Sequence, residues 1–313
     1  MALAVTAATR DVTNAHGTAT PTPLVLAAAV GAGDLVMFFV TNNKAGSYQS
    51  ISTITSSPAL TWTREWIFEN DQVGGSIKCN MELWTAENTG SGISAGGLTI
   101  TPTFGSATDA ICYAAWSVSG QGSTYTDPNV SLPANTVNTS GGAGTHVSVG
   151  GVSTTNTDTI IFGFFGDGTP GFPSPDTGWT GLVGYDNAAG SDFGSIFAEY
   201  KIFSTAQSGI TVDTTGSNQT LWQFVAYAIQ GAAANITGTF APTEGSDVGT
   251  FAGSNGSGTT GTFVSTEASD VANFTGPPLS GVLAAIEGSD FVPPLTQFNI
   301  DITHRKRRII IIS

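Results

Sequence analysis

Short runs of apolar and β-branched residues recur through the first 231 residues, separated by Gly, Asn, Asp and Pro. Several runs alternate with period two: in Leu98–Thr103 every second residue is Thr. Such alternation is typical of a strand with one buried face. The stretch Leu221–Ile229 is apolar at both parities, which predicts a strand buried on both faces. No stretch has the spacing of an amphipathic helix, so the pattern predicts an all-β chain.

The strand pattern occurs twice within residues 1–231. Gly33–Val40 matches Thr157–Phe164, Thr61–Thr63 matches Gly178–Thr180, Met81–Ala86 matches Phe197–Ile202, and Ile111–Gly120 matches Gln223–Gly231 at its final five positions. Many short strands bounded by turn residues favour sandwiches or jelly rolls. We therefore expect two related β-sandwich or jelly-roll-like units, residues 1–122 and 123–231. The pattern leaves open whether they form separate bodies or one.

Aromatic and sulfur-containing side chains in these strands are expected to belong mainly to the core. The tryptophans are Trp62, Trp66, Trp84, Trp116, Trp179 and Trp222. Exposed aromatic rings would instead suit a sugar-stacking surface, for which Tyr48, Tyr125 and Tyr185, near predicted loops, are the better candidates. Cys79 and Cys112 are too few for a disulfide framework, so buried thiols are expected, with a single bridge as the alternative.

A ten-residue motif recurs after residue 232, starting at Gly238, Gly261 and Gly281 and ending each time in Glu-x-x-Asp. Residues 232–295 are a Gly-rich β-repeat tail with few large apolar residues. Burial at roughly 25 cal/mol per Å² would not offset backbone ordering at about 1–2 kcal/mol per residue. The repeats are therefore expected to stack on neighbours, either along the chain or on other copies of it. Their acidic pairs favour structural turns over calcium sites.

The last segment, residues 296–313, combines a basic cluster with an apolar end. The predicted anchoring residues are Arg305, Lys306, Arg307, Arg308, Ile309, Ile310, Ile311 and Ile312. A bare apolar strand is an aggregation hazard unless it is paired. It is expected either to complete the protein's own last sheet or to dock on a partner's sheet, with the basic residues meeting an acidic surface.

Charge excludes some classes of partner. The chain has 23 acidic and nine basic residues, a net charge of −14, which argues against nucleic-acid binding by the main body. The first residues lack the features of a signal peptide, and no stretch approaches the roughly 20 apolar residues of a membrane span. We therefore expect a product made in the cytoplasm.

Residue patterns for catalysis are weak. Gly92–Gly96 fits Gly-x-Ser-x-Gly, but the residues after it predict a strand instead of the helix that a nucleophile elbow requires. His16, His146 and His304 lack metal-ligand spacing. Acidic residues that cluster in the sequence could supply a carboxylate pair for glycoside hydrolysis, but they are expected to form a solvated rim instead. They are Glu65, Glu69, Asp71, Glu82 and Glu87. No cofactor, metal site or enzymatic activity is predicted.

The duplicated half resembles the β-sandwich modules of virion surface proteins of tailed bacteriophages. The resemblance is carried by the apolar run in Gly33–Val40, the Trp-Thr strand, Glu82–Ala86 and the closing Trp116–Gly120. The short repeats after residue 232 also resemble tracts in phage fibre and surface proteins. The resemblance implies a non-enzymatic virion part, such as a decoration, fibre or tail protein, assembled inside the host with other virion proteins. A homo-oligomer, with a trimer as one arrangement, would give the tail repeats neighbours.

The alternative function is a carbohydrate-binding module or receptor-binding adhesin that contacts a host surface glycan. Phage surface sandwiches can serve both purposes, because weak sugar contacts gain strength from many copies.

Overall fold

The computed structural model describes residues 3–10, 18–72, 77–126, 134–137, 147–155, 158–167, 171–189, 192–215 and 222–232, and the backbone of six strands between 236 and 302. The chain divides into two compact units, Met1–Gly231 and Ala232–Ser313. Every regular element in the described residues is a β-strand, which confirms the all-β prediction. In the same residues, no helix has the length and apolar character needed to cross a membrane.

The first unit contains two large antiparallel sheets, here called inner sheets 1 and 2. Inner sheet 1 has the order β1-β9-β4-β7-β6, and β2 also pairs with β9. Inner sheet 2 has the order β10-β18-β13-β16-β15, and β11 also pairs with β18. The strands of inner sheet 1 are β1 (Ala4–Val5), β2 (Thr9–Arg10), β4 (Leu35–Ala45), β6 (Thr63–Gln72), β7 (Ile77–Glu87) and β9 (Ala110–Ser119). Those of inner sheet 2 are β10 (Gln121–Thr126), β11 (Ala134–Val137), β13 (Thr159–Asp167), β15 (Thr180–Ala189), β16 (Asp192–Phe203) and β18 (Trp222–Gly231).

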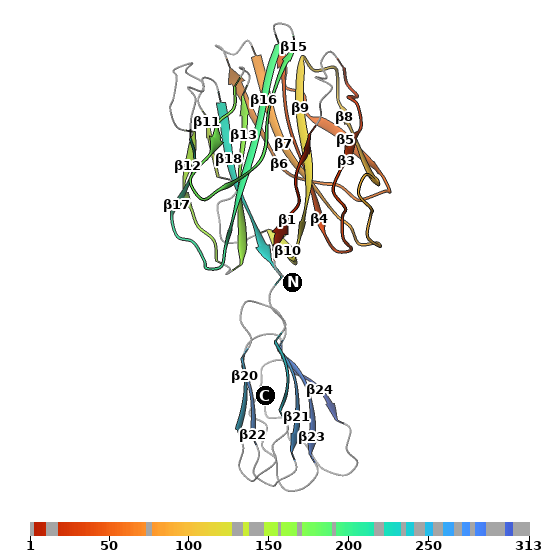
Figure 1. The fold of residues 1–313 in the computed structure, drawn as a ribbon, viewed down its shortest axis with the longest axis vertical. Helices are drawn as coiled ribbons and strands as arrows, with labels where there is room; N and C mark the ends of the chain where they lie inside the picture. Colours follow the sequence, from red (N-terminus) through yellow and green to blue (C-terminus); the bar gives the residue numbers. More distant parts are fainter. Residues whose placement is uncertain are drawn as a thin grey trace. The chain divides into compact units, whose positions relative to one another are not determined.

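Each inner sheet is accompanied by a three-stranded outer sheet. Outer sheet 1 has the order β3-β8-β5, and outer sheet 2 has the order β12-β17-β14. Their strands are β3 (Leu24–Leu26), β5 (Ile51–Ser57), β8 (Leu98–Phe104), β12 (Ser148–Val152), β14 (Ser174–Pro175) and β17 (Ile210–Thr215). Figure 1 shows β3, β5 and β8 on one side of this unit and β12 and β17 on the other, with the inner sheets between them.

The register of the inner sheets repeats between the two halves. In β4, Leu35 pairs with Glu87 of β7 and Val118 of β9. In β13, Thr159 pairs with Phe203 of β16 and Gln230 of β18. The duplicated segments of the sequence therefore occupy the same places in two sheets of the same strand order.

Alternate residues of the inner strands enter different cores. In β4, Leu35, Met37 and Phe39 lie in a central core, whereas the residues between them face outer sheet 1. The central core also contains residues of β13 and β18, and Phe164 of β13 lies 4.8 Å from Phe39 between ring centroids. The two halves therefore share one core and form a single body. Strand β18 contributes to the central core and to the core of outer sheet 2, which confirms the predicted burial of its two faces.

The predictions for tryptophan and cysteine can be compared with this packing. Trp66, Trp116 and Trp222 are buried core residues. The remaining tryptophans are half-buried and pack against the cores of the outer sheets; they are Trp62, Trp84 and Trp179. Cys79 in β7 and Cys112 in β9 are buried thiols that form no disulfide.

Parallel pairing distinguishes the second unit, which has a four-stranded and a two-stranded sheet. The first has the order β19-β21-β23-β24, and the second pairs β20 with β22. Gly238, Gly261 and Gly281, the first residues of the three sequence repeats, are in register across β19, β21 and β23. The strands are β19 (Ile236–Phe240), β20 (Val248–Ala252), β21 (Thr259–Ser265), β22 (Val271–Thr275), β23 (Leu279–Ala285) and β24 (Phe298–Ile302). The Glu-x-x-Asp pairs lie outside the described residues.

Candidate functional site

A groove of about 750 Å³ opens beside the end of β7 in the first half of the body. One wall is the connection from β5 to β6, residues 58–61, together with Thr63. The floor is the end of β7, Thr85–Glu87, and the second wall is the connection from β7 to β8, residues 88–94, with Gly97. Its volume falls within the range of small-molecule sites, roughly 300–1,000 Å³.

The wall formed by residues 88–97 is held by hydrogen bonds. The buried Asn88 side chain donates from Nδ2 to the carbonyls of Gly31 and Ser91, both at 2.9 Å. The backbones of Val30 and Ile93 form two hydrogen bonds, of 2.9 and 2.7 Å. A loop fixed at both of these places presents a preformed surface.

The opposite wall is fixed from one side chain. Ser56 Oγ accepts hydrogen bonds from the Leu60 backbone N–H at 3.0 Å and from Trp62 Nε1 at 3.2 Å. Leu60 and Trp62 also pack against the core of outer sheet 1. Ile93 of the other wall packs against the same core, so both walls are anchored in it.

The lining of the groove is rich in hydroxyl groups and carries one carboxylate. No Lys, Arg or His is among the lining residues of the described chain. Glu87 is exposed, and the half-buried Ile93 and exposed Pro58 supply apolar surface. The hydroxyl-bearing lining residues are Thr61, Thr63, Thr85, Thr89, Ser91 and Ser94.

The Gly-x-Ser-x-Gly segment contributes to this lining but lacks the geometry of a nucleophile elbow. The Gly97 N–H donates to the Ser94 carbonyl at 2.9 Å, closing a turn that leads directly into strand β8. A nucleophile elbow requires a helix after the serine. As the sequence predicts, a strand follows.

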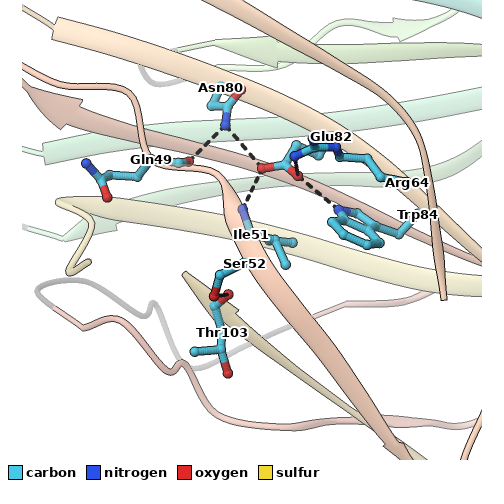
Figure 2. Close-up of polar contacts among 8 residues, drawn as sticks. All are labelled: Gln49, Ile51, Ser52, Arg64, Asn80, Glu82, Trp84 and Thr103. Carbon is cyan, nitrogen blue, oxygen red and sulfur yellow. Dashed lines mark hydrogen bonds and ion pairs between the residues drawn. The ribbon is translucent and has the colours of Figure 1, made fainter. Parts of the chain in front are cut away.

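A buried carboxylate, Glu82, lies on the same strand as the groove floor, β7, and is the centre of a polar network (Figure 2). Its Oε1 accepts from the Ile51 N–H at 2.8 Å and Asn80 Nδ2 at 3.1 Å, and its Oε2 accepts from Trp84 Nε1 at 2.9 Å. Arg64 Nη1 lies 3.6 Å from Oε2. Because Ile51 belongs to β5 and Glu82 to β7, this network joins outer sheet 1 to inner sheet 1.

Glu82 contradicts the prediction of a solvated acidic rim. Its side chain is fully buried, and this burial raises its pKa above the ordinary value, while the hydrogen bonds and the charge of Arg64 oppose the rise. The prediction is wrong here because three hydrogen-bond donors and the charge of Arg64 replace the lost water.

The other predicted rim residues have different surroundings. Glu69 and Glu87 are exposed, as expected. Glu65 is half-buried: it accepts from Thr85 Oγ1 and from the Tyr227 hydroxyl, the latter at 3.0 Å. Since Tyr227 belongs to β18, Glu65 connects the two halves of the body. The side chain of Asp71 lies outside the described part.

A second buried carboxylate, Glu199, was not among the predicted site residues. Its Oε2 accepts from the Asp176 N–H at 3.2 Å, and Oε1 has no hydrogen-bond partner among the described residues. Burial raises the pKa of Glu199 to about 8, and the nearby charges of Asp176 and Asp213 add to the rise. In the described part of the chain, no three His, Cys, Asp or Glu side chains are grouped to hold a metal ion.

Two of the predicted contact tyrosines, Tyr48 and Tyr185, are not among the residues that line the groove. The Tyr48 ring is half-buried, with Lys78 Nζ 5.3 Å from its centroid. Tyr185 packs against the central core beneath the Arg10 guanidinium, whose carbon lies 4.5 Å from the ring centroid. The Tyr125 side chain and residues 305–312 lie outside the described residues, so their predicted roles stay predictions.

The groove was not predicted from the sequence, because its walls come from connections about 30 residues apart. A hydroxyl-rich, Gly-rich connection before Leu98 was the one available signal. Comparisons of the chain with protein-family models, with curated proteins and with solved structures found no match.

Proposed function

We propose that this protein is a structural component of a tailed-bacteriophage particle, made in the host cytoplasm and exposed on the particle surface as a decoration, fibre or tail protein. In this proposal the body comprises two duplicated, jelly-roll-like β-sandwich units, and the Gly-rich repeats anchor it. Its partners are other virion proteins and further copies of the same chain.

The parallel register of the repeats is the observation that carries the proposal. Gly238, Gly261 and Gly281 are aligned on neighbouring strands, so each repeat adds one strand to a growing sheet. Such a stack ends in a strand that can accept another strand by backbone pairing. In the sheet order, β19 and β24 are these terminal strands, and β24 precedes the predicted anchor.

The construction of the first unit is consistent with a passive structural role. Its four sheets pack on three apolar cores, and the named strands within these sheets pair antiparallel. An acidic chain with a net charge of −14 also suits a surface displayed in many copies, because like charges limit non-specific association.

Deletion of residues 296–313 tests the anchoring role in a phage that encodes this chain. We expect the truncated protein to be absent from purified particles. Because the deletion also removes β24, the folding control is the first unit alone, whose tryptophan fluorescence should match that of the full chain. A second variant, with Arg305, Lys306, Arg307 and Arg308 replaced by Gln, tests the charge separately at full length. Incorporation of the truncated protein at the normal level would refute the anchoring role, and absence of the full chain from particles would refute the virion assignment.

A second candidate function is glycan binding by a receptor-binding adhesin. It is favoured by the preformed groove with its hydroxyl-bearing lining.

A further inference from the structure

We propose that the groove beside Glu87 binds a neutral saccharide. This inference deepens the second candidate function and names its site and its class of ligand. It is independent of particle membership, because binding can be measured on the isolated protein.

The chemistry of the lining selects the ligand. Saccharide hydroxyls both donate and accept hydrogen bonds, and the five exposed Thr and Ser side chains of the lining do the same; the sixth, Thr85, is buried and already donates to Glu65. The exposed Glu87 carboxylate can accept from two adjacent sugar hydroxyls in charge-assisted hydrogen bonds. With no basic residue in the lining, an anionic ligand would meet Glu87 without a compensating charge. A neutral polyol therefore fits better than a phosphate or an acidic sugar.

Apolar surface is also present where a sugar ring could use it. Pro58 is exposed on one wall and Ile93 is half-exposed on the other. The C–H face of a pyranose ring can pack on such residues while its hydroxyls reach the polar groups between them. Small-molecule sites commonly combine apolar walls with a few placed polar groups.

The walls require little ordering when a ligand binds. Asn88 and Ser56 already fix the two connections through their hydrogen bonds. A preformed site avoids part of the entropic cost of binding, which matters for a weakly binding ligand such as a sugar.

The second half of the body has the same strand order but a different residue at the position of Glu87. The position in register with Glu87 is Phe203, because Leu35 pairs with Glu87 and the equivalent Thr159 pairs with Phe203. Phe203 packs edge-to-face on Trp179, with ring centroids 6.2 Å apart, and Lys201 Nζ lies 5.4 Å from its ring centroid. The exposed carboxylate is thus found in the first half only, and the strand arrangement that the two halves share does not require it.

The test uses the full chain on an array of neutral oligosaccharides built from hexoses, deoxyhexoses and N-acetylhexosamines, with sialylated and sulfated counterparts. We expect binding to neutral glycans. Glu87→Gln keeps the shape and removes the charge, so it should weaken the best neutral interaction roughly tenfold or more. Glu69→Gln, an exposed carboxylate on β6 outside the groove lining, is the matched control and should bind like the parent.

Thr89→Trp provides a second, steric test, because it places a large ring on an exposed position of the groove wall. We expect loss of glycan binding with an unchanged thermal transition. The proposal is overturned if no neutral glycan binds, if only acidic glycans bind, or if neutral binding survives both Glu87→Gln and Thr89→Trp. None of these outcomes bears on particle incorporation, which the deletion of residues 296–313 tests separately.

Discussion

Replacing Glu199 with Gln is expected to remove a large pH dependence from the stability of the first unit. Glu199 lies on β16 with its side chain fully buried, and burial raises its pKa from 4.5 to about 8. Asp176 and Asp213 reinforce the rise because a second negative charge nearby disfavours ionisation. We therefore expect the carboxyl group to be protonated in the folded protein at neutral pH.

The sign of the effect follows from proton binding in the two states. Below pH 4.5 Glu199 is protonated in both, so the stability from keeping it neutral is fully present. Between 4.5 and about 8 the unfolded chain releases a proton that the folded chain retains, so the free energy of unfolding falls as pH rises. The slope is about 1.4 kcal/mol per pH unit, and the whole interval amounts to a loss on the order of 5 kcal/mol. Above about pH 8 the loss levels off.

The assay is urea unfolding followed by tryptophan fluorescence at intervals from pH 5 to pH 9. All six tryptophans lie between Trp62 and Trp222, so the signal reports on the first unit. Gln is neutral at every pH and can still accept from the Asp176 N–H. The stability of Glu199→Gln relative to the parent should therefore rise from pH 5 to about pH 8 and then remain constant.

Glu69→Gln is the matched control, because Glu69 is exposed. Its stability curve should run parallel to that of the parent. If Glu199→Gln also runs parallel to the parent across the whole range, Glu199 does not retain its proton on folding and the reasoning is refuted.

Three further substitutions test the packing of the body by the same urea assay. Glu82→Gln should lower the free energy of unfolding by about 1–3 kcal/mol at pH 7, because its amide would face a buried donor, Trp84 Nε1 or the Ile51 N–H; unchanged stability would contradict this. Phe164→Ala should lower the free energy of unfolding by about 3–5 kcal/mol and leave a single unfolding transition, because its ring contacts Phe39 of the other half. Separate transitions for the two halves would argue against a shared core. Gly166→Ala should lower the free energy of unfolding by roughly 1–3 kcal/mol, because its new Cβ would lie 2.7 Å from Thr41 Cγ2. The control is Gly150→Ala, whose closest contact is at 3.7 Å and which should be nearly neutral. Equal effects of the two substitutions would contradict the packing.

The strands and the duplication could be predicted because both depend on local patterns. The apolar residues of Gly33–Val40 and Thr157–Phe164 predict strands, and β4 and β13 lie there. The parallel register of the repeats follows the sequence in the same way, since Gly238, Gly261 and Gly281 are aligned.

The polar features could not be predicted, because they depend on contacts between residues far apart in sequence. Nothing adjacent to Glu82 indicates that the Ile51 N–H, 31 residues away, will replace its water. Glu65 likewise acquires its contact with Tyr227 from a strand 162 residues later. An acidic residue in a strand of alternating pattern is usually exposed. Hydrogen-bond donors that are distant in sequence allow these carboxylates to be buried or half-buried instead.

The contrast between continuous and alternating apolar strands explains the order of the sheets. Strand β8 is buried at every second residue, from Leu98 to Phe104, so it can cover one core only. Strand β9 is buried at all but its last residue and must be covered on both faces. Each half has one outer sheet, which covers one face of its inner sheet. The other face needs an equally apolar surface, and the inner sheet of the duplicate supplies it. Duplication thus buries the second apolar face of each inner sheet, which in a single half would have to be covered by another chain.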